Sequence, residues 1–85
     1  MESSDAARIF AALSQESRLG VVRLLLAHGA DGLPAGELAD RLAMPASTTS
    51  FHLSALERAG LIGATRQGRQ VIYAVRIAAL REMRY

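Results

Sequence analysis

The stretch that decides the fold is Glu37-Leu-Ala-Asp-Arg-Leu-Ala-Met-Pro-Ala-Ser-Thr-Thr-Ser-Phe-His-Leu-Ser-Ala-Leu-Glu-Arg-Ala-Gly-Leu61, followed by Arg66-Gln-Gly-Arg-Gln-Val-Ile-Tyr73. Its first part predicts two short helices joined by a sharp turn, and its second part predicts a β-hairpin with a basic tip. A unit of this kind places the N-terminal end of one helix in a DNA major groove and lays the hairpin along the neighbouring phosphates. DNA binding is therefore the first functional hypothesis.

The composition is that of one small domain spanning residues 1–85. Hydrophobic residues make up 51% of the 85, but a chain this short buries only about 60–65% of its unfolded surface, so a partner chain would add useful burial. The absence of cysteine excludes disulfides, thiolate metal sites and cysteine nucleophiles. Apolar runs are far shorter than the roughly 20 residues of a membrane span, and the acidic start lacks a signal peptide's positive region. We expect a soluble, cytoplasmic protein that does not contact membranes.

Charge is distributed unevenly along the chain. The net charge is only +2, yet residues 1–42 carry four arginines against six acids, and residues 43–85 carry six arginines against two acids. No acid lies between Glu57 and Glu82. All ten basic residues are arginine, which suits bidentate contacts to phosphate and guanine. A merely solvated basic face would give the same pattern, so charge alone leaves both interpretations open.

Apolar spacing predicts a mainly α-helical domain with a small β-hairpin, in the order of four helices, two strands and a fifth helix. Ser14 can cap the second helix, and Gly29 can end it. The segment 30–34 has the composition of a loop. The expected helices are 5–13, Ser14 to about His28, 35–42, 46–59 and 77–85, and the expected strands are 61–66 and 70–75.

The helix over residues 46–59 has two faces. Thr49, Leu53 and Leu56 share one face and should pack on the core. Small hydroxyls on the other face, at the N-terminal end of the helix, can approach phosphates and base edges closely. Simple helix capping by Ser47 or Thr48 is the alternative. At the hairpin tip, Arg66 and Arg69 flank Gly68, which predicts a wing that grips phosphates, although an ordinary solvated turn has similar residues.

The order of residues resembles the ArsR/SmtB family of bacterial winged helix-turn-helix repressors. The pieces that carry the resemblance are Ala12-Leu-Ser-Gln-Glu-Ser-Arg-Leu19, Glu37-Leu-Ala39, Ser47-Thr-Thr-Ser-Phe-His-Leu53 with Ala59-Gly-Leu61, and Arg66-Gln-Gly-Arg69 with Ile72-Tyr73. The resemblance implies a homodimer built on the first and last helices. It also implies that each subunit offers its fourth helix to half of a double-stranded DNA operator, and that an effector releases the dimer.

Carried over residue by residue, the resemblance assigns DNA binding to the fourth helix and to the hairpin tip. The residues are Ser47, Thr48, Ser50, Phe51, His52, Arg66 and Arg69. Phe51 stands where many members have a polar or basic residue, so it can touch a thymine methyl or simply cover the helix. His52 can contact a base, or lie half-buried behind the helix and position it. The expected dimer contacts are Ile9, Phe10, Ile77, Leu80 and Met83.

The sensor is where the sequence departs from the family. Many members respond to arsenic or to other metals through a Cys-x-Cys motif, where this chain has Leu33-Pro-Ala-Gly-Glu37. Others use aspartate and histidine near the last helix, and Val75-Arg-Ile-Ala78 has neither. We therefore expect no metal site and no cofactor, and the inducer stays unassigned. The chain stops about where a sensing tail would begin in some branches, so a truncated protein is an open possibility.

Other functions explain the sequence less well. No serine, histidine and acid are suitably spaced for a hydrolase, and no glycine-rich phosphate loop is present, so an enzyme is not expected. The main rival is a winged-helix module that binds protein instead of DNA, but such a module would more often expose apolar or acidic residues on this helix. A DNA-binding regulator without any inducer is a third interpretation.

Overall fold

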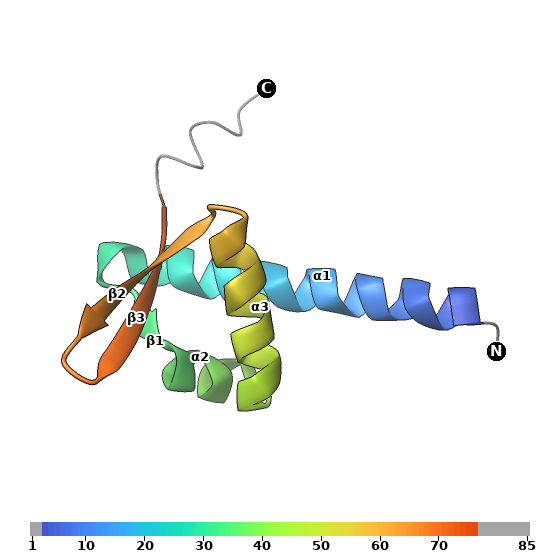
Figure 1. Ribbon diagram of the computed structural model, residues 1–85, viewed down its shortest axis with the longest axis horizontal. Helices are drawn as coiled ribbons and strands as arrows, with labels where there is room; N and C mark the ends of the chain where they lie inside the picture. The colour runs from blue at the N-terminus through green and yellow to red at the C-terminus, as the bar shows by residue number, and fades with distance from the viewer. Residues whose placement is uncertain (1–2, 77–85) are drawn as a thin grey trace, which may run out of the picture.

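The computed structural model describes residues 3–76, which form three α-helices and a small antiparallel sheet (Figure 1). This mainly helical winged fold confirms the class predicted from the sequence. The predicted last helix, 77–85, lies outside the described residues. In chain order the elements are α1 (Ser3–His28), a 3-10 turn (Gly29–Asp31), β1 (Leu33–Pro34), α2 (Ala35–Leu42), α3 (Ala46–Arg58), β2 (Ile62–Gln67) and β3 (Gln70–Val75).

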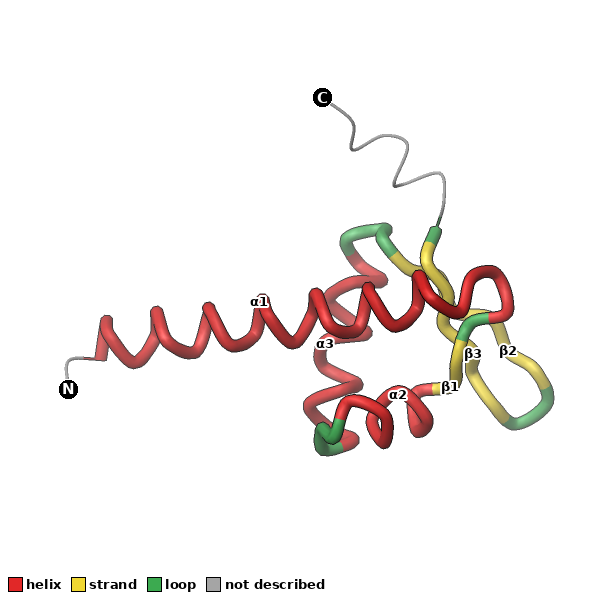
Figure 2. The backbone as a smooth tube through the Cα atoms, turned by 180° about the vertical axis from the view of Figure 1, so that it is seen from behind, coloured by secondary structure: helices red, strands yellow, loops and turns green. Residues whose placement is uncertain are grey.

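The first two predicted helices are one continuous helix, α1. The predicted break at Ser14 is wrong, because no glycine or proline interrupts residues 3–19 and the alanines around Ser14 favour helix. Figures 1 and 2 show the N-terminal part of α1 extending well beyond the rest of the described fold. The helix ends as predicted before Gly29, which has a φ of 65° and begins the short 3-10 turn.

The turn between α2 and α3 is closed by backbone hydrogen bonds. Ala43 adopts a left-handed conformation with a φ of 52°. Its N–H donates to the carbonyl of Asp40, and the N–H of Met44 donates to the carbonyl of Ala39 over 3.0 Å. This pattern ends α2 and reverses the chain, so that α3 can begin directly after Pro45. The helix-turn-helix lies where the sequence predicted it.

The sheet has three strands in the order β1-β3-β2, all antiparallel. The hairpin of β2 and β3 was predicted, but β1 was not: residues 30–34 were assigned to a loop. In the structure Leu33 pairs with Tyr73 and Pro34 pairs with Ile72. A β-carbon at Gly32 would collide with the Tyr73 carbonyl, so this glycine lets the chain pass close to β3.

The core joins the three helices to the sheet. Seven hydrophobic side chains form it, and they come from α1, α2, α3, β1 and β2: Val21, Leu25, Leu33, Leu38, Leu53, Leu56 and Ile62. Leu53 and Leu56 were predicted to face inward. Because α3 contributes its core side chains from one face only, its opposite face is left to the surface. No helix among residues 3–76 is long and apolar enough to cross a membrane.

Candidate nucleic-acid interface

Helix α3 presents a polar surface at its N-terminal end. Ser47, Thr48, Ser50 and Phe51 are exposed, whereas Thr49, Leu53 and Leu56 are buried, as the two-face prediction required. The residue that caps the helix is Pro45, and no side chain accepts a capping hydrogen bond from the first-turn amides. Ser47 and Thr48 therefore do not act as the helix cap. Their hydroxyls and the first-turn amides are available for an anion or a base edge.

The buried Thr49 is accommodated by its own helix. Only 1% of the residue is exposed, and its hydroxyl donates to the carbonyl of Pro45 over 3.1 Å. The bond satisfies a polar atom that would otherwise be costly to bury. Thr49 thus acts as a core residue that also ties the first turn of α3 to its cap.

His52 is buried beneath the exposed face, with 3% of its surface accessible. The Arg18 Nε of α1 donates to His52 Nδ1 over 3.2 Å, which leaves the proton of the neutral ring on Nε2. Burial, and secondarily the charge of Arg18, lowers the pKa of His52 below its ordinary value of 6.5. The neutral ring therefore links α1 to α3 at physiological pH.

Phe51 lies beside this link and is 59% exposed, an unusual position for a phenylalanine. The guanidinium carbon of Arg18 lies 5.5 Å from the centre of the Phe51 ring, within cation–π range. The Phe51 and His52 rings meet edge to face at 5.8 Å. We call Arg18, Phe51 and His52 the arginine clamp. It holds the exposed aromatic ring in place on the surface of α3.

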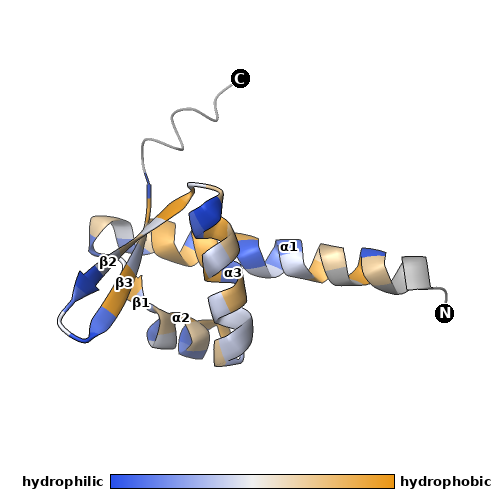
Figure 3. Cartoon of the chain, viewed as in Figure 1, coloured by the Kyte–Doolittle hydropathy of each residue, from blue (hydrophilic) through white to orange (hydrophobic). Residues whose placement is uncertain are grey.

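The hairpin tip carries the predicted arginines. Arg66 pairs with Val71 near the end of β2, and Gly68, with a φ of 63°, lies in the turn between the strands. Arg66 Nε donates to the Gly68 carbonyl over 3.4 Å, and both Arg66 and Arg69 are exposed. Figure 3 shows strongly hydrophilic residues at this tip. Because both side chains are already exposed, they can contact phosphate without giving up buried contacts.

The structure groups the predicted residues into two separate surfaces. Ser47, Thr48, Ser50 and Phe51 gather on α3, whereas Arg66 and Arg69 lie at the hairpin tip, with α2 between them (Figures 1 and 2). His52 belongs to the first group by position but is covered. The predicted dimer residues Ile77, Leu80 and Met83 lie outside the described residues, as does the side chain of Phe10.

Sequence reasoning missed Arg18 as a partner of α3. The only available signal was its place in the stretch of residues 12–19 that carries the family resemblance, which says nothing about a contact 34 positions along the chain. His28 is the last residue of α1 and accepts a hydrogen bond from Arg41 over 2.9 Å. Among residues 3–76, no three acidic or histidine side chains gather where they could hold a metal ion.

Comparison with known proteins supports the class that this geometry defines. Residues 2–62 match the helix-turn-helix domain family. The chain is 38% identical over 72 residues to the uncharacterized HTH-type transcriptional regulator YceK of Bacillus subtilis, covering 81% of this chain and 71% of that protein. The chain is therefore a helix-turn-helix DNA-binding regulator and not an enzyme.

Solved structures narrow the class to a family. An ArsR-like transcriptional regulator from Rhodococcus sp. RHA1 aligns with a TM-score of 0.70 and 32% identity, covering 94% of this chain and 73% of that chain. The homodimeric winged helix-turn-helix DNA-binding domain of Mb0332 from Mycobacterium bovis, a possible ArsR-family regulator, has a TM-score of 0.66 and 30% identity, covering 93% and 76%. The chain belongs to the ArsR family of winged helix-turn-helix transcriptional regulators.

Proposed function

We propose that the chain is a sequence-specific repressor that binds a palindromic operator as a homodimer. The observation that carries the proposal is the N-terminal end of α3, where small hydroxyls are exposed beside unpaired amides while the opposite face anchors the helix in the core. A helix presented in this way can enter a major groove without disturbing its own packing. Such a regulator acts on bacterial DNA in the cytoplasm.

The residues of the interface have different roles in this proposal. Ser47, Thr48, Ser50 and Phe51 supply contacts to base edges and to thymine methyl groups. Arg66 and Arg69 supply phosphate contacts from the wing, the hairpin of β2 and β3. His52 acts as a positioning residue, because its burial leaves it facing Arg18 and not the DNA. Two such subunits would place their α3 helices about 34 Å apart along the duplex.

We expect this chain to carry no arsenic sensor. In the relatives that the family resemblance suggests, the arsenic response depends on thiolates, and this chain of 85 residues has no cysteine. The stretch from Leu33 to Glu37, where a Cys-x-Cys motif would stand, forms β1 and the first turn of α2. We therefore expect arsenite to leave DNA binding unchanged.

Selection from a pool of randomised DNA duplexes tests the proposal directly. We expect the bound fraction to converge on an imperfect palindrome, and we expect that site to lower transcription by a bacterial RNA polymerase when it overlaps a promoter. A protein-interaction module would enrich no sequence. Enrichment without repression would leave a DNA-binding regulator that does not repress.

The wing is tested by replacing Arg69 with alanine. Each lost phosphate contact should reduce the slope of log affinity against log salt by about one unit, on specific and random duplexes alike. Fluorescence anisotropy over a series of salt concentrations measures this slope. Arg23→Gln, which removes an exposed arginine from α1, is the matched control and should retain the slope. An unchanged slope in the Arg69→Ala protein would mean that Arg69 of the wing does not contact phosphate.

A further inference from the structure

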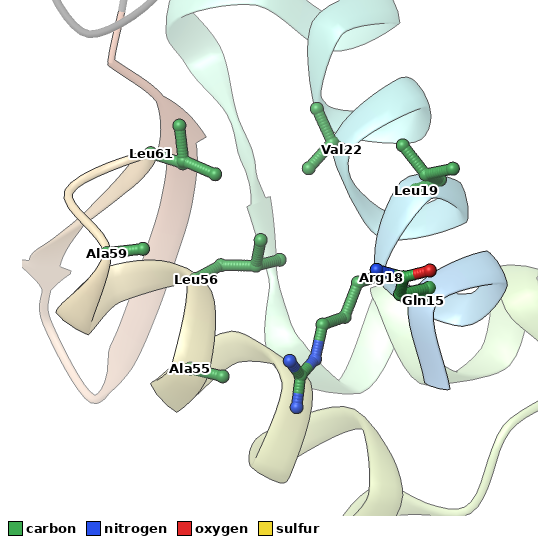
Figure 4. Close-up of a pocket in the computed structure, with 8 residues that line it drawn as sticks. All are labelled: Gln15, Arg18, Leu19, Val22, Ala55, Leu56, Ala59 and Leu61. Atoms are coloured by element: carbon green, nitrogen blue, oxygen red, sulfur yellow. The ribbon is translucent and has the colours of Figure 1, made fainter. Parts of the chain in front are cut away.

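A groove between α1 and α3 opens next to the arginine clamp. It is an open groove of about 440 Å³ and is mostly apolar. Its lining includes Leu19 and Val22 of α1, Ala55 and Leu56 of α3, and Leu61. Figure 4 shows Arg18 reaching across this groove from α1 towards α3. Leu19, on its wall, is 54% exposed, so the groove leaves apolar surface uncovered. The volume is within the range of small-molecule sites.

Arg18 gives the groove a charge that the described protein does not neutralise. Among residues 3–76, Arg18 donates through Nε to the neutral ring of His52, and its guanidinium lies over the ring of Phe51. No carboxylate within that range forms an ion pair with it. The two Nη groups therefore remain for a planar anion, which a guanidinium binds in bidentate fashion.

We propose that this groove binds an organic acid with an aliphatic tail, whose carboxylate pairs with Arg18 while the tail covers Leu19, Val22 and Ala55. The apolar walls select the tail, and the arginine selects the anionic head. A chain of about eight carbons is compatible with the volume of the groove. The site uses side chains of α1 and α3 and needs no metal.

The same arginine connects the site to the proposed DNA-reading surface, so this part of the inference rests on the proposed function. A carboxylate paired with the Nη groups neutralises the guanidinium, which weakens its cation–π contact with the Phe51 ring. We infer that ligand binding loosens the arginine clamp and lowers operator affinity, by the fivefold or more that is typical of coupled sites.

Binding is tested without DNA, on the whole chain, with octanoate and with 1-octanol as the uncharged probe of equal length. We expect octanoate to shift the methyl resonances of Leu19, Val22, Ala55 and Leu61 saturably, and 1-octanol to bind about tenfold more weakly. Arg18→Gln should reduce octanoate affinity to that of octanol. Arg23→Gln, which removes the same charge elsewhere on α1, should leave octanoate affinity unchanged.

A second variant separates the groove from the arginine. Ala55→Leu fills the apolar wall but leaves Arg18 in place, so it should abolish octanoate binding without unfolding the protein, as circular dichroism would verify. The inference is overturned if the methyl resonances do not respond to octanoate, as they would not if residues 77–85 or a second copy closed the groove. Equal affinity for octanoate and octanol would also overturn it.

The coupling between octanoate binding and DNA binding is tested with the operator selected from the random pool. We expect saturating octanoate to weaken wild-type binding to this operator about fivefold or more and to leave Ala55→Leu unaffected. Unchanged operator affinity in octanoate-saturated wild type would overturn the coupling. Failure of the proposed function is distinguishable, because a protein that binds no DNA in the absence of octanoate can still give the methyl shifts.

Discussion

At the residue scale, Thr48 is the side chain best placed to read sequence. It is exposed in the first turn of α3 and takes no part in capping. Replacing it with alanine removes a hydroxyl and a methyl group without touching the core. We expect Thr48→Ala to lose about tenfold in affinity for the selected operator and to retain its affinity for random duplexes, because base contacts and not phosphate contacts are removed.

Competition anisotropy with the selected and random duplexes measures both affinities. Ser54→Ala is the matched control, because Ser54 is an exposed hydroxyl residue of the same helix, away from its N-terminal end. It should leave both affinities unchanged. Equal losses on both duplexes for Thr48→Ala would show that this hydroxyl contacts the backbone and does not read bases.

We expect His52 to make the stability of the fold depend on pH. Its pKa is lowered in the folded state by burial and by Arg18, so the unfolded chain takes up the proton first as the pH falls. The stabilising contribution is therefore complete above about pH 6.5, decreases as the pH falls below that value, and is lost below the folded-state pKa. We expect the free energy of unfolding, measured by urea denaturation, to decrease between pH 7 and pH 5.

Replacing His52 with glutamine should flatten this part of the pH profile, because glutamine does not titrate. His28→Gln, at the end of α1, should preserve it and serves as the control. If His52→Gln and the wild type lose stability in parallel between pH 7 and pH 5, the protonation of His52 does not drive the effect.

At the element scale, the turn that joins α2 to α3 is built on an alanine in a conformation that favours glycine. Ala43 has a φ of 52°, which costs a residue with a β-carbon about 1–2 kcal/mol, while glycine adds entropy to the unfolded chain. We expect Ala43→Gly to raise the free energy of unfolding by about 0.5–1 kcal/mol, measured by urea denaturation.

The opposite substitution provides the matched control. Gly60 ends α3 with a φ of 79°, and the Leu61 N–H donates to the Leu56 carbonyl across it, as in the α2 turn. Gly60→Ala should therefore destabilise the protein by about 1 kcal/mol. A destabilised Ala43→Gly would mean that the entropy of the unfolded chain outweighs the relief of strain.

Helices and strands could be predicted from the sequence where residues close together in the chain determine them. Apolar spacing placed α2 and α3, and Gly68 placed the hairpin turn, because these signals act within a few residues. β1 was missed because two residues, one of them Pro34, carry no periodicity and depend on pairing with β3. The false break at Ser14 arose because serine is a good cap, yet without a helix breaker nearby it also remains inside a helix.

The candidate site shows the same division. The hydroxyls of α3 and the arginines of the wing could be identified from the sequence because each group is local. The contact between Arg18 and His52 could not, because it depends on how α1 crosses α3. Of the two roles that the sequence left open for His52, its burial favours the positioning residue over direct base contact. Tertiary packing, not residue type, decides which polar side chains face the solvent.

At the scale of the whole molecule, the N-terminal part of α1 carries apolar surface with nothing of the described chain to cover it. Ile9 and Leu13 lie one turn apart on the same face and are 50% and 58% exposed. A small domain gains much by burying such a face against a second subunit. The homodimeric Mb0332 domain shows that a related fold assembles in pairs, which supports the dimer proposed for this chain.

Replacing Ile9 and Leu13 together with aspartate tests this interface. The charges would have to be buried between subunits, so we expect sedimentation velocity to show a monomer for the double variant and a dimer for the wild type. Affinity for the palindromic operator should fall about 100-fold or more, towards that for a single half-site, because the second contact is no longer linked to the first. Ala11→Asp, on the opposite face of α1, should remain dimeric. A wild type that is monomeric would exclude the dimer. A double variant that stays dimeric would place the interface elsewhere.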